Sequence, residues 1–305
     1  MPLGGSMGRM CEGRVAIVTG AGRGLGREHA LLLAAQGAKV VVNDIGAGID
    51  GSGIDQSPAN AVVQQIAQQG GEAIANGEDV SDWNGAKAMI DATIARFGRL
   101  DVLINNAGIL RDRMLTNMSE QEWDSVIRVH LKGTFAPARH ASAYWRDESK
   151  KIGGPVRARI INTTSTSGIF GNVGQTNYGA AKAAIAAFTI IAARELVRYG
   201  ITVNAVSPSA HTRMTEGLRV LTPEERALRD PKWVSPIVVY LASDEAQDIT
   251  GRVIQAGVGR IAVLEGWRRG AEVAQVEDPA IAGALVREMI ARVRKNSGMD
   301  GMELD

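Results

Sequence analysis

The sequence predicts a single α/β domain, doubly wound around a parallel sheet of about seven strands. Along the chain, short runs of apolar and β-branched residues alternate with longer amphipathic stretches. Strands buried on both faces have such continuous apolar runs, and their alternation with helices indicates parallel βαβ crossovers. A glycine-rich turn also follows the first apolar run directly. The 305 residues are enough to bury one large core.

The predicted elements begin at residue 14. The strands are expected, in order, over 14–19, 39–43, 73–76, 101–104, 159–162 and 202–206. The helices between them are expected over about 25–36, 59–69, 82–97, from 119 onward, and over 176–199. Ser119 and Glu122 have the spacing of a capping box, which indicates that the fourth helix begins there.

Two terminal segments flank the predicted α/β domain at 13–262. Residues 1–12 contain no hydrophobic core of a signal peptide, and we expect a loose leader. Residues 263–305 contain a predicted helix over 277–294 with a basic end. This extension is too short to fold alone, so we expect it to pack on the core or on a neighbouring subunit.

Composition excludes several functional classes. The 34 basic and 33 acidic residues nearly balance, so neither nucleic acid nor a membrane surface is expected as a partner. No apolar run approaches the roughly 18 residues that a membrane span needs. The single cysteine, Cys11, provides neither an internal disulfide nor a thiolate cluster, and we expect no metal. These features predict a cytoplasmic protein that acts on a small molecule.

The turn TGAGRGLG at 19–26 has the composition of a phosphate-binding loop. Glycines allow a tight turn and let backbone amides at a helix N-terminus approach a pyrophosphate. The strict G-x-G-x-x-G spacing is absent, and a plain tight turn is the alternative. The candidate cofactor contacts in this turn are Gly20, Arg23, Gly24, Leu25 and Gly26.

Asp44 ends the second predicted strand, 18 residues after Gly26. An acidic residue there can accept both ribose hydroxyls of NAD and repels the 2′-phosphate of NADP. Arg23 argues for NADP, because a basic residue in the glycine turn can pair with that phosphate. We expect NAD rather than NADP, since the Asp44 carboxylate would occupy the place of the phosphate. A solvated turn aspartate is the alternative.

The most specific pattern is Tyr178-Gly-Ala-Ala-Lys182, with Ser165 thirteen residues before the tyrosine. Residues at i and i+4 share one face of a helix. A free tyrosine has a pKa of about 10, and a neighbouring ammonium lowers it toward the range useful for proton transfer. Ser165 could hold an alcohol oxygen by a hydrogen bond. The three residues predict acid–base chemistry on an alcohol; a surface i, i+4 pair is the alternative.

With these motifs the sequence resembles the short-chain dehydrogenase/reductase superfamily over residues 13 to about 262. The resemblance implies a Rossmann-type fold, an NAD(P)-dependent oxidoreductase, and a homo-oligomer, either a dimer or a tetramer. It also implies that Tyr178 and Lys182 contact the cofactor, Lys182 at the nicotinamide ribose. The matching positions beyond the glycine turn are Asp79, Val80, Asn105, Asn106, Ala107, Gly108, Ser165, Tyr178, Lys182 and Pro208.

The resemblance assigns Asp79 and Val80 to the adenine, and Asn106, Ala107 and Gly108 to the adenosine ribose. Two positions depart from the family pattern. His130 stands where many members carry an asparagine that completes a proton relay. It could hold the relay water, shuttle protons itself, or simply pack.

The second departure follows Pro208, where Arg213 takes the place of a threonine. Thr212 could then supply the hydroxyl for the cofactor carboxamide.

A closer resemblance is to the dehydrogenase domains of the peroxisomal D-bifunctional, or 17β-hydroxysteroid dehydrogenase type 4, family. It is carried by NDIG at 43–46, GILRDR at 108–113, RVHLKGTF at 128–135, GQTNYGAAKA at 174–183 and TRMTEG at 212–217. This resemblance implies oxidation of a (3R)-hydroxyacyl-CoA, or of a steroid-like secondary alcohol, to the ketone. Arg111, Arg113 and Arg213 could then meet a CoA phosphate, or they are ordinary surface arginines.

Two other functions stay open. An NADPH-dependent reductase of ketones, quinones or 3-oxoacyl groups would use the same residues, and Arg23 is the feature that favours it. A non-catalytic dinucleotide-binding protein is a third possibility. The complete Ser-Tyr-Lys set argues against it, because a protein that only binds a dinucleotide needs no acid–base group.

Overall fold

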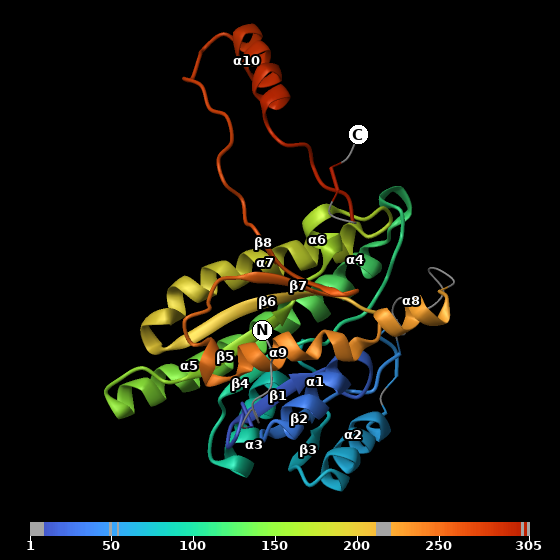
Figure 1. Cartoon of the computed structure of the whole chain (residues 1–305), viewed down its shortest axis with the longest axis vertical. Coiled ribbons are helices and arrows are strands. Elements are labelled where there is room, and N and C mark those ends of the chain that lie inside the picture. Colours follow the sequence, from blue (N-terminus) through green and yellow to red (C-terminus); the bar gives the residue numbers. More distant parts are fainter. Residues whose placement is uncertain (1–8, 49–50, 54, 212–220, 300–301, 304–305) are drawn as a thin grey trace, which may run out of the picture.

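The chain forms one sheet with the strand order β3-β2-β1-β4-β5-β6-β7-β8 in the computed structural model (Figure 1). The structure describes residues 9–48, 51–53, 55–211, 221–299 and 302–303. Neighbouring strands from β3 through β7 pair in parallel, and β8 pairs antiparallel with β7. The predicted doubly wound parallel sheet of about seven strands is therefore confirmed, with one antiparallel strand added at its edge.

Six of the strands lie within a few residues of the predicted positions. The longest, β6, continues three residues beyond the predicted end, to Ser209. The edge strand β8 crosses the predicted domain boundary at residue 262. The strands are β1 Val15–Thr19, β2 Lys39–Asn43, β3 Ala73–Asn76, β4 Val102–Asn105, β5 Ala158–Thr163, β6 Ile201–Ser209, β7 Val253–Gly257 and β8 Arg260–Leu264.

Helices cover both faces of the sheet and close two apolar cores. On one face α1 (Gly24–Ala35), α2 (Ser57–Gln68) and α9 (Ser235–Ala242) bury residues such as Leu33 and Ile66. On the other face lie α3 (Trp83–Phe97), α5 (Gly133–Ile152) and α7 (Thr176–Leu196). This two-sided burial is why the strands consist of continuous apolar residues.

The helix predicted from residue 119 onward consists of two helices. α4 (Glu120–Ile127) begins with the predicted capping box between Ser119 and Glu122. A π-helical turn, Arg128–Lys132, then joins α4 to α5 and carries His130. The described residues also contain the short helices α6 (Thr166–Phe170) and α8 (Pro223–Leu228), and 3₁₀ turns at 115–117, 197–199, 231–233 and 244–246.

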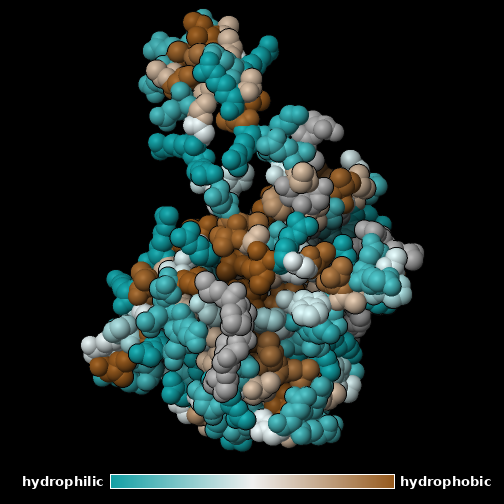
Figure 2. Space-filling view, viewed as in Figure 1, coloured by the Kyte–Doolittle hydropathy of each residue, from teal (hydrophilic) through white to brown (hydrophobic). Residues whose placement is uncertain are grey.

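The terminal segments differ in burial. Cys11, within the predicted leader, is 1% exposed, and its Sγ lies 3.7 Å from the backbone oxygen of Val239 on α9. At the other end, α10 (Pro279–Arg292) stands away from the sheet (Figure 1) and has no buried residue. Figure 2 shows apolar side chains on the segment that carries α10. Packing of the extension on a neighbouring subunit stays a prediction.

No helix in the described part of the chain is both long enough and apolar enough to cross a membrane.

Candidate active site

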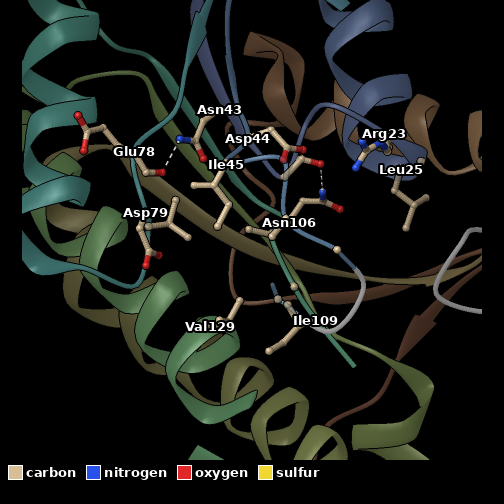
Figure 3. Close-up of a pocket in the computed structure, with 18 of the residues that line it drawn as sticks. Arg23, Leu25, Asn43, Asp44, Ile45, Glu78, Asp79, Asn106, Ile109 and Val129 are labelled. Atoms are coloured by element: carbon tan, nitrogen blue, oxygen red, sulfur yellow. Dashed lines mark hydrogen bonds between the residues drawn. The ribbon is translucent and has the colours of Figure 1, made fainter. Parts of the chain in front are cut away.

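A cavity of about 190 Å³ opens at the carboxyl ends of β1, β2 and β4 (Figure 3). Here the strand order reverses, because β1 lies between β2 on one side and β4 on the other. Such a switch point is where open α/β sheets bind their ligands. The cavity is lined by Gly20, Arg23, Gly24, Leu25, Asn43, Asp44, Ile45, Ala47, Gly48, Gly51, Glu78, Asp79, Val80, Asn106, Ala107, Gly108, Ile109, Arg128 and Val129.

The glycine turn forms the floor beside helix α1. Gly20 has a φ of +62° and Gly24 a φ of +53°, a conformation that favours glycine. Gly26 packs so closely that a Cβ atom there would overlap the carbonyl oxygen of Gly20. The turn therefore brings the N-terminus of α1 to the cavity, as a pyrophosphate site requires.

Asn106 fastens this turn to the next strand. Its Nδ2 donates to the carbonyl oxygens of Thr19 and Gly20, at 3.0 and 3.2 Å. In return, the Thr19 hydroxyl accepts from the backbone amides of Asn106 and Ala107. The sequence pattern identified Asn106 and Ala107 but not Thr19, whose role depends on a contact 87 residues away in the chain.

The Asp44 carboxylate lies at the cavity, where Figure 3 shows it with Arg23. One oxygen accepts from the amide of Gly22 and the other from the amide of Gly46, both at 2.7 Å. The position is therefore fixed by the glycine turn on one side and by its own loop on the other. The Arg23 guanidinium lies 4.0 Å from the Asp55 carboxylate, which partly offsets its charge.

Asp79 and Val80 line the cavity together with two residues that the sequence did not indicate, Glu78 and Arg128. Burial raises the pKa of Asp79, but hydrogen bonds from Ser81 and the charge of Arg128 outweigh this effect and lower it. Arg128 Nη1 donates to Asp79 and, at 2.9 Å, to the Ser81 hydroxyl. Asp79 is thus held as a carboxylate.

Ser165, Tyr178 and Lys182 lie beside the cavity. Ser165 follows β5 as the N-cap of α6, while Tyr178 and Lys182 lie on α7. The Lys182 Nζ atom lies 5.6 Å from the centre of the Tyr178 ring and donates to the carbonyl oxygen of Thr163 at 2.6 Å. Ile109 lines the cavity and also packs in the cluster that contains Tyr178, which links the two sites.

Burial dominates the acid–base properties of this group. It raises the pKa of Tyr178 to about 12, although a hydrogen bond with Ser165 acts to lower it. It lowers the pKa of Lys182 to about 7. In the chain alone, burial is the first cause of the raised pKa of Tyr178 and acts against the lowering that the sequence predicts from Lys182.

His130 is 2% exposed and packs edge-on against Tyr178, with ring centres 5.1 Å apart. Its Nε2 lies 2.8 Å from the carbonyl oxygen and 3.1 Å from the amide nitrogen of Ile109. Burial and the nearby Lys182 charge lower the pKa of His130 to about 3. Its Nδ1 has no hydrogen-bond partner among the described residues.

Other predicted contacts are placed differently. Thr212, Arg213 and the motif at 212–217 lie outside the described residues. The Arg113 guanidinium lies 3.1 Å from the Glu122 carboxylate. The backbone carbonyl of Arg111 accepts from Asn177 Nδ2 at 2.9 Å.

Asn177, which is 0% exposed, was not indicated by the sequence. Its position beside Tyr178 was the available signal.

The described residues contain no group of three or more His, Cys, Asp or Glu side chains placed to hold a metal ion.

The cavity lies at the switch point of the sheet, between a glycine turn and an acidic strand end. A serine, a tyrosine and a lysine lie next to it. Together these features define the class of dinucleotide-binding oxidoreductases. The family model of the short chain dehydrogenases matches residues 14–221, and the chain belongs to this family. Its members act on CH–OH groups with a nicotinamide dinucleotide, NAD or NADP, and the chain is an oxidoreductase of this type.

Three known proteins show the similarity. Over 277 residues the chain is 41% identical to the peroxisomal hydratase-dehydrogenase-epimerase of Neurospora crassa, covering 91% of this chain but only 30% of that protein. It is 46% identical over 247 residues to the hydroxyacyl-CoA dehydrogenase ChsB1 of Mycobacterium tuberculosis, covering 79% of this chain and 76% of that one. A crystal structure of a short chain dehydrogenase from Mycobacterium avium superposes with a TM-score of 0.85 at 49% identity, covering 95% and 98% of the chains.

Proposed function

We propose that the protein oxidises the hydroxyl group of a (3R)-hydroxyacyl-CoA to the ketone, with NAD as the hydride acceptor. The observation that carries this proposal is that Tyr178, with Lys182 and Ser165 around it, packs against Ile109, which lines the same cavity as Asp44. The substrate class is supported by the mycobacterial relative, which is named a hydroxyacyl-CoA dehydrogenase. The Neurospora relative is about three times as long, so its other activities give no support.

In the proposed reaction, the protein binds and deprotonates the alcohol. The Ser165 hydroxyl holds the substrate oxygen by a hydrogen bond, and the Tyr178 phenolate oxygen accepts the proton from that oxygen. Burial lowers the pKa of Lys182 to about 7, and in its ammonium form Lys182 stabilises the phenolate. A bound NAD would supply the acceptor for the hydride of the carbinol carbon and a cationic ring that favours the phenolate.

The residues at the cavity fit NAD. Each oxygen of the Asp44 carboxylate accepts one hydrogen bond from a backbone amide. The remaining lone pairs can accept from ribose hydroxyls. The same charge repels a 2′-phosphate, while Arg23, the residue that would attract it, is partly offset by Asp55. We therefore propose NAD as the preferred cofactor over NADP.

We assign His130 a role as an uncharged imidazole. With a pKa of about 3 the ring is uncharged at working pH, so it does not carry protons as an imidazolium. When Nε2–H donates to Ile109, the partnerless Nδ1 is a hydrogen-bond acceptor suited to a relay water. If it instead only packs, His130→Gln, whose amide nitrogen can still donate to Ile109 but which lacks the Nδ1 acceptor, would leave turnover unchanged.

The test is formation of reduced nicotinamide, followed by absorbance, with the (3R)- and (3S)-hydroxyacyl-CoA and with NAD or NADP in parallel. The proposal predicts turnover of the 3R form with NAD. Turnover of steroid-like alcohols but of neither acyl-CoA would replace the substrate class.

A second candidate, an NADPH-dependent reductase, is favoured by Arg23 at the cavity. A lower KM for NADPH than for NADH in the reverse reaction would support it. Tight cofactor binding without turnover of any alcohol or ketone would support a non-catalytic dinucleotide-binding protein.

We also propose that the protein is a homo-oligomer, a dimer or a tetramer. A shallow surface hollow runs between α5 and α7, lined among others by Phe135, Ser142, Phe188 and Leu196. Light scattering on the purified protein tests this proposal.

A cytoplasmic location likewise stays a prediction, which imaging of the tagged protein in its own cells would test.

A further inference from the structure

Asn177 lies on α7 directly before Tyr178, and its buried side chain makes three hydrogen bonds to backbone groups. The residue is 0% exposed. Its Nδ2 donates to the carbonyl oxygen of Arg111 at 2.9 Å and to that of Glu122 at 3.1 Å. Its Oδ1 accepts from the backbone amide of Tyr178 at 2.7 Å. A side-chain amide has two protons to donate, so both are used here.

The hydrogen bond to the Tyr178 amide satisfies a group that the helix itself leaves without a partner. α7 begins at Thr176, and the first four amides of a helix have no carbonyl partner within it. The carbonyl of Gly174, four residues before Tyr178, instead accepts from the amide of Arg113 at 2.8 Å. Asn177 Oδ1 therefore fixes the backbone from which the phenol projects.

The segment 109–113, to which Asn177 donates, is also part of the cavity wall. Ile109 lines the cavity, and its carbonyl oxygen lies 2.8 Å from His130 Nε2. His130 in turn packs edge-on against the Tyr178 ring. The segment therefore reaches Tyr178 in two ways, at the backbone through Asn177 and at the ring through His130.

Two further hydrogen bonds join the same segment to the start of α7. One is the bond from the Arg113 amide to Gly174, and the other runs from Gln175 Nε2 to the Asp112 carboxylate at 2.8 Å. Asn177 differs from both because its side chain also binds the Tyr178 amide. Since the two other bonds remain when Asn177 is truncated, we expect the helix to stay in place and Tyr178 to lose its fixed position.

We propose that Asn177 is a positioning residue whose side chain fixes Tyr178 relative to the segment 109–113 and so places the phenol oxygen for proton transfer. Proton transfer requires heavy atoms within about 2.6–3.2 Å of each other, and a displacement of about 1 Å can cost about 10²-fold in rate. Asn177 acts through Tyr178 rather than on the substrate. This inference rests on the proposed function of Tyr178.

The experiment compares Asn177→Ala with Asn204→Ala, a matched control on β6. Asn204 is 1% exposed, and it also bridges backbone groups, donating to the Ile249 carbonyl at 2.7 Å and accepting from the Arg252 amide at 3.0 Å. Both changes should therefore lower the unfolding temperature. We expect only Asn177→Ala to lower kcat for oxidation, by about 10–100-fold, with the KM for NAD within about threefold of wild type.

A second variant, Asn177→Ser, covers the case in which Asn177→Ala is not recovered folded. A serine hydroxyl has one proton and cannot donate to both carbonyls, so kcat should fall in this variant as well.

A second readout needs no substrate. Fluorine NMR of protein labelled with 3-fluorotyrosine reports on the four tyrosines, and Tyr178→Phe assigns the signal of Tyr178. This signal should shift or broaden in Asn177→Ala and stay unchanged in Asn204→Ala. If wild type oxidises no hydroxyacyl-CoA, the proposed function fails, whereas the signal still shows whether Asn177 holds Tyr178.

A loss of kcat and a changed Tyr178 signal in the Asn177 variants alone support the inference. A folded Asn177 variant with wild-type kcat or an unchanged signal overturns it. An equal loss of kcat in Asn204→Ala also overturns it, because the effect would then follow from lower stability.

Discussion

The nucleotide cavity and the catalytic group lie at the same edge of the sheet, yet they are built from different kinds of contact. Around the cavity, backbone amides and carbonyls hold the side chains in place, as in the hydrogen bonds of Asp44 and Asn106. The catalytic group instead uses buried ionisable side chains, and burial sets their pKa values. The difference teaches that the cavity lining is held by hydrogen bonds within the chain, whereas we expect the proposed catalytic tyrosine to depend on charges that its ligands bring.

The largest effect is expected in the catalytic region, from Lys182→Met. The change removes the ammonium under the Tyr178 ring and its hydrogen bond to Thr163. We expect kcat to fall about 10²–10⁴-fold, the range of a lost acid–base contribution, while the protein stays folded. Steady-state kinetics measures kcat, and a thermal unfolding scan shows whether the variant is folded. Lys87→Met on the exposed side of α3 is the control, and a loss below about tenfold would contradict the assignment.

In the nucleotide region, Asp44→Asn should alter cofactor preference rather than the chemical step. The change removes the negative charge that would repel a 2′-phosphate. It also weakens the hydrogen bonds that the carboxylate would accept from the ribose, which are worth about 1.5–3 kcal/mol each. We expect the KM for NAD to rise about tenfold or more, and the ratio of kcat/KM for NADP to that for NAD to increase. Asp91→Asn on α3 is the comparison variant. An unchanged ratio would show that Asp44 does not select the cofactor.

A smaller effect is expected from a buried group behind the cavity. His29 on α1 lies 2.8 Å from the Ser235 hydroxyl, and burial lowers its pKa from 6.5 to about 3. Below pH 6.5 the unfolded chain binds a proton that the folded protein does not. The free energy of unfolding should therefore fall by about 1.4 kcal/mol per pH unit from this group as the pH drops from 6.5 toward 3.

Chemical denaturation at a series of pH values measures this slope. His29→Asn should reduce this slope and leave the part that comes from the buried His130. Equal slopes in wild type and His29→Asn would contradict the burial argument.

The smallest effect on the fold is expected from removal of the extension after Leu264. None of the residues of α10 is buried, so the unfolding temperature of the α/β domain should change by no more than about 2–4 °C. A larger drop, or a change in the oligomeric state by light scattering, would show that the extension stabilises the assembly.

The sequence predicted the parts of the site whose signal is local. The glycine turn, Asp44 at a strand end, and Tyr178 with Lys182 on one helix face are all predicted from residue types and spacing within short stretches of the chain. The capping box of Ser119 and Glu122 was confirmed for the same reason.

Features that depend on distant residues were not predictable. The π-helical turn at Arg128–Lys132 interrupts an amphipathic pattern that continues through it, and β8 is a strand only because β7 offers an edge. Asp112 and Thr19 accept hydrogen bonds from residues 63 and 87 positions away in the chain. The pKa of Tyr178 could not be predicted either, because it depends on how deeply the hydroxyl is buried.

The most direct test of the central claim is the rate of NAD-dependent oxidation of a (3R)-hydroxyacyl-CoA by Tyr178→Phe, with Tyr240→Phe on α9 as the control. The account predicts a loss of about 10²–10⁴-fold in kcat for Tyr178→Phe, with NADH still bound, and no comparable loss for Tyr240→Phe. Turnover of Tyr178→Phe within a few-fold of wild type would contradict the role of Tyr178 as the catalytic base.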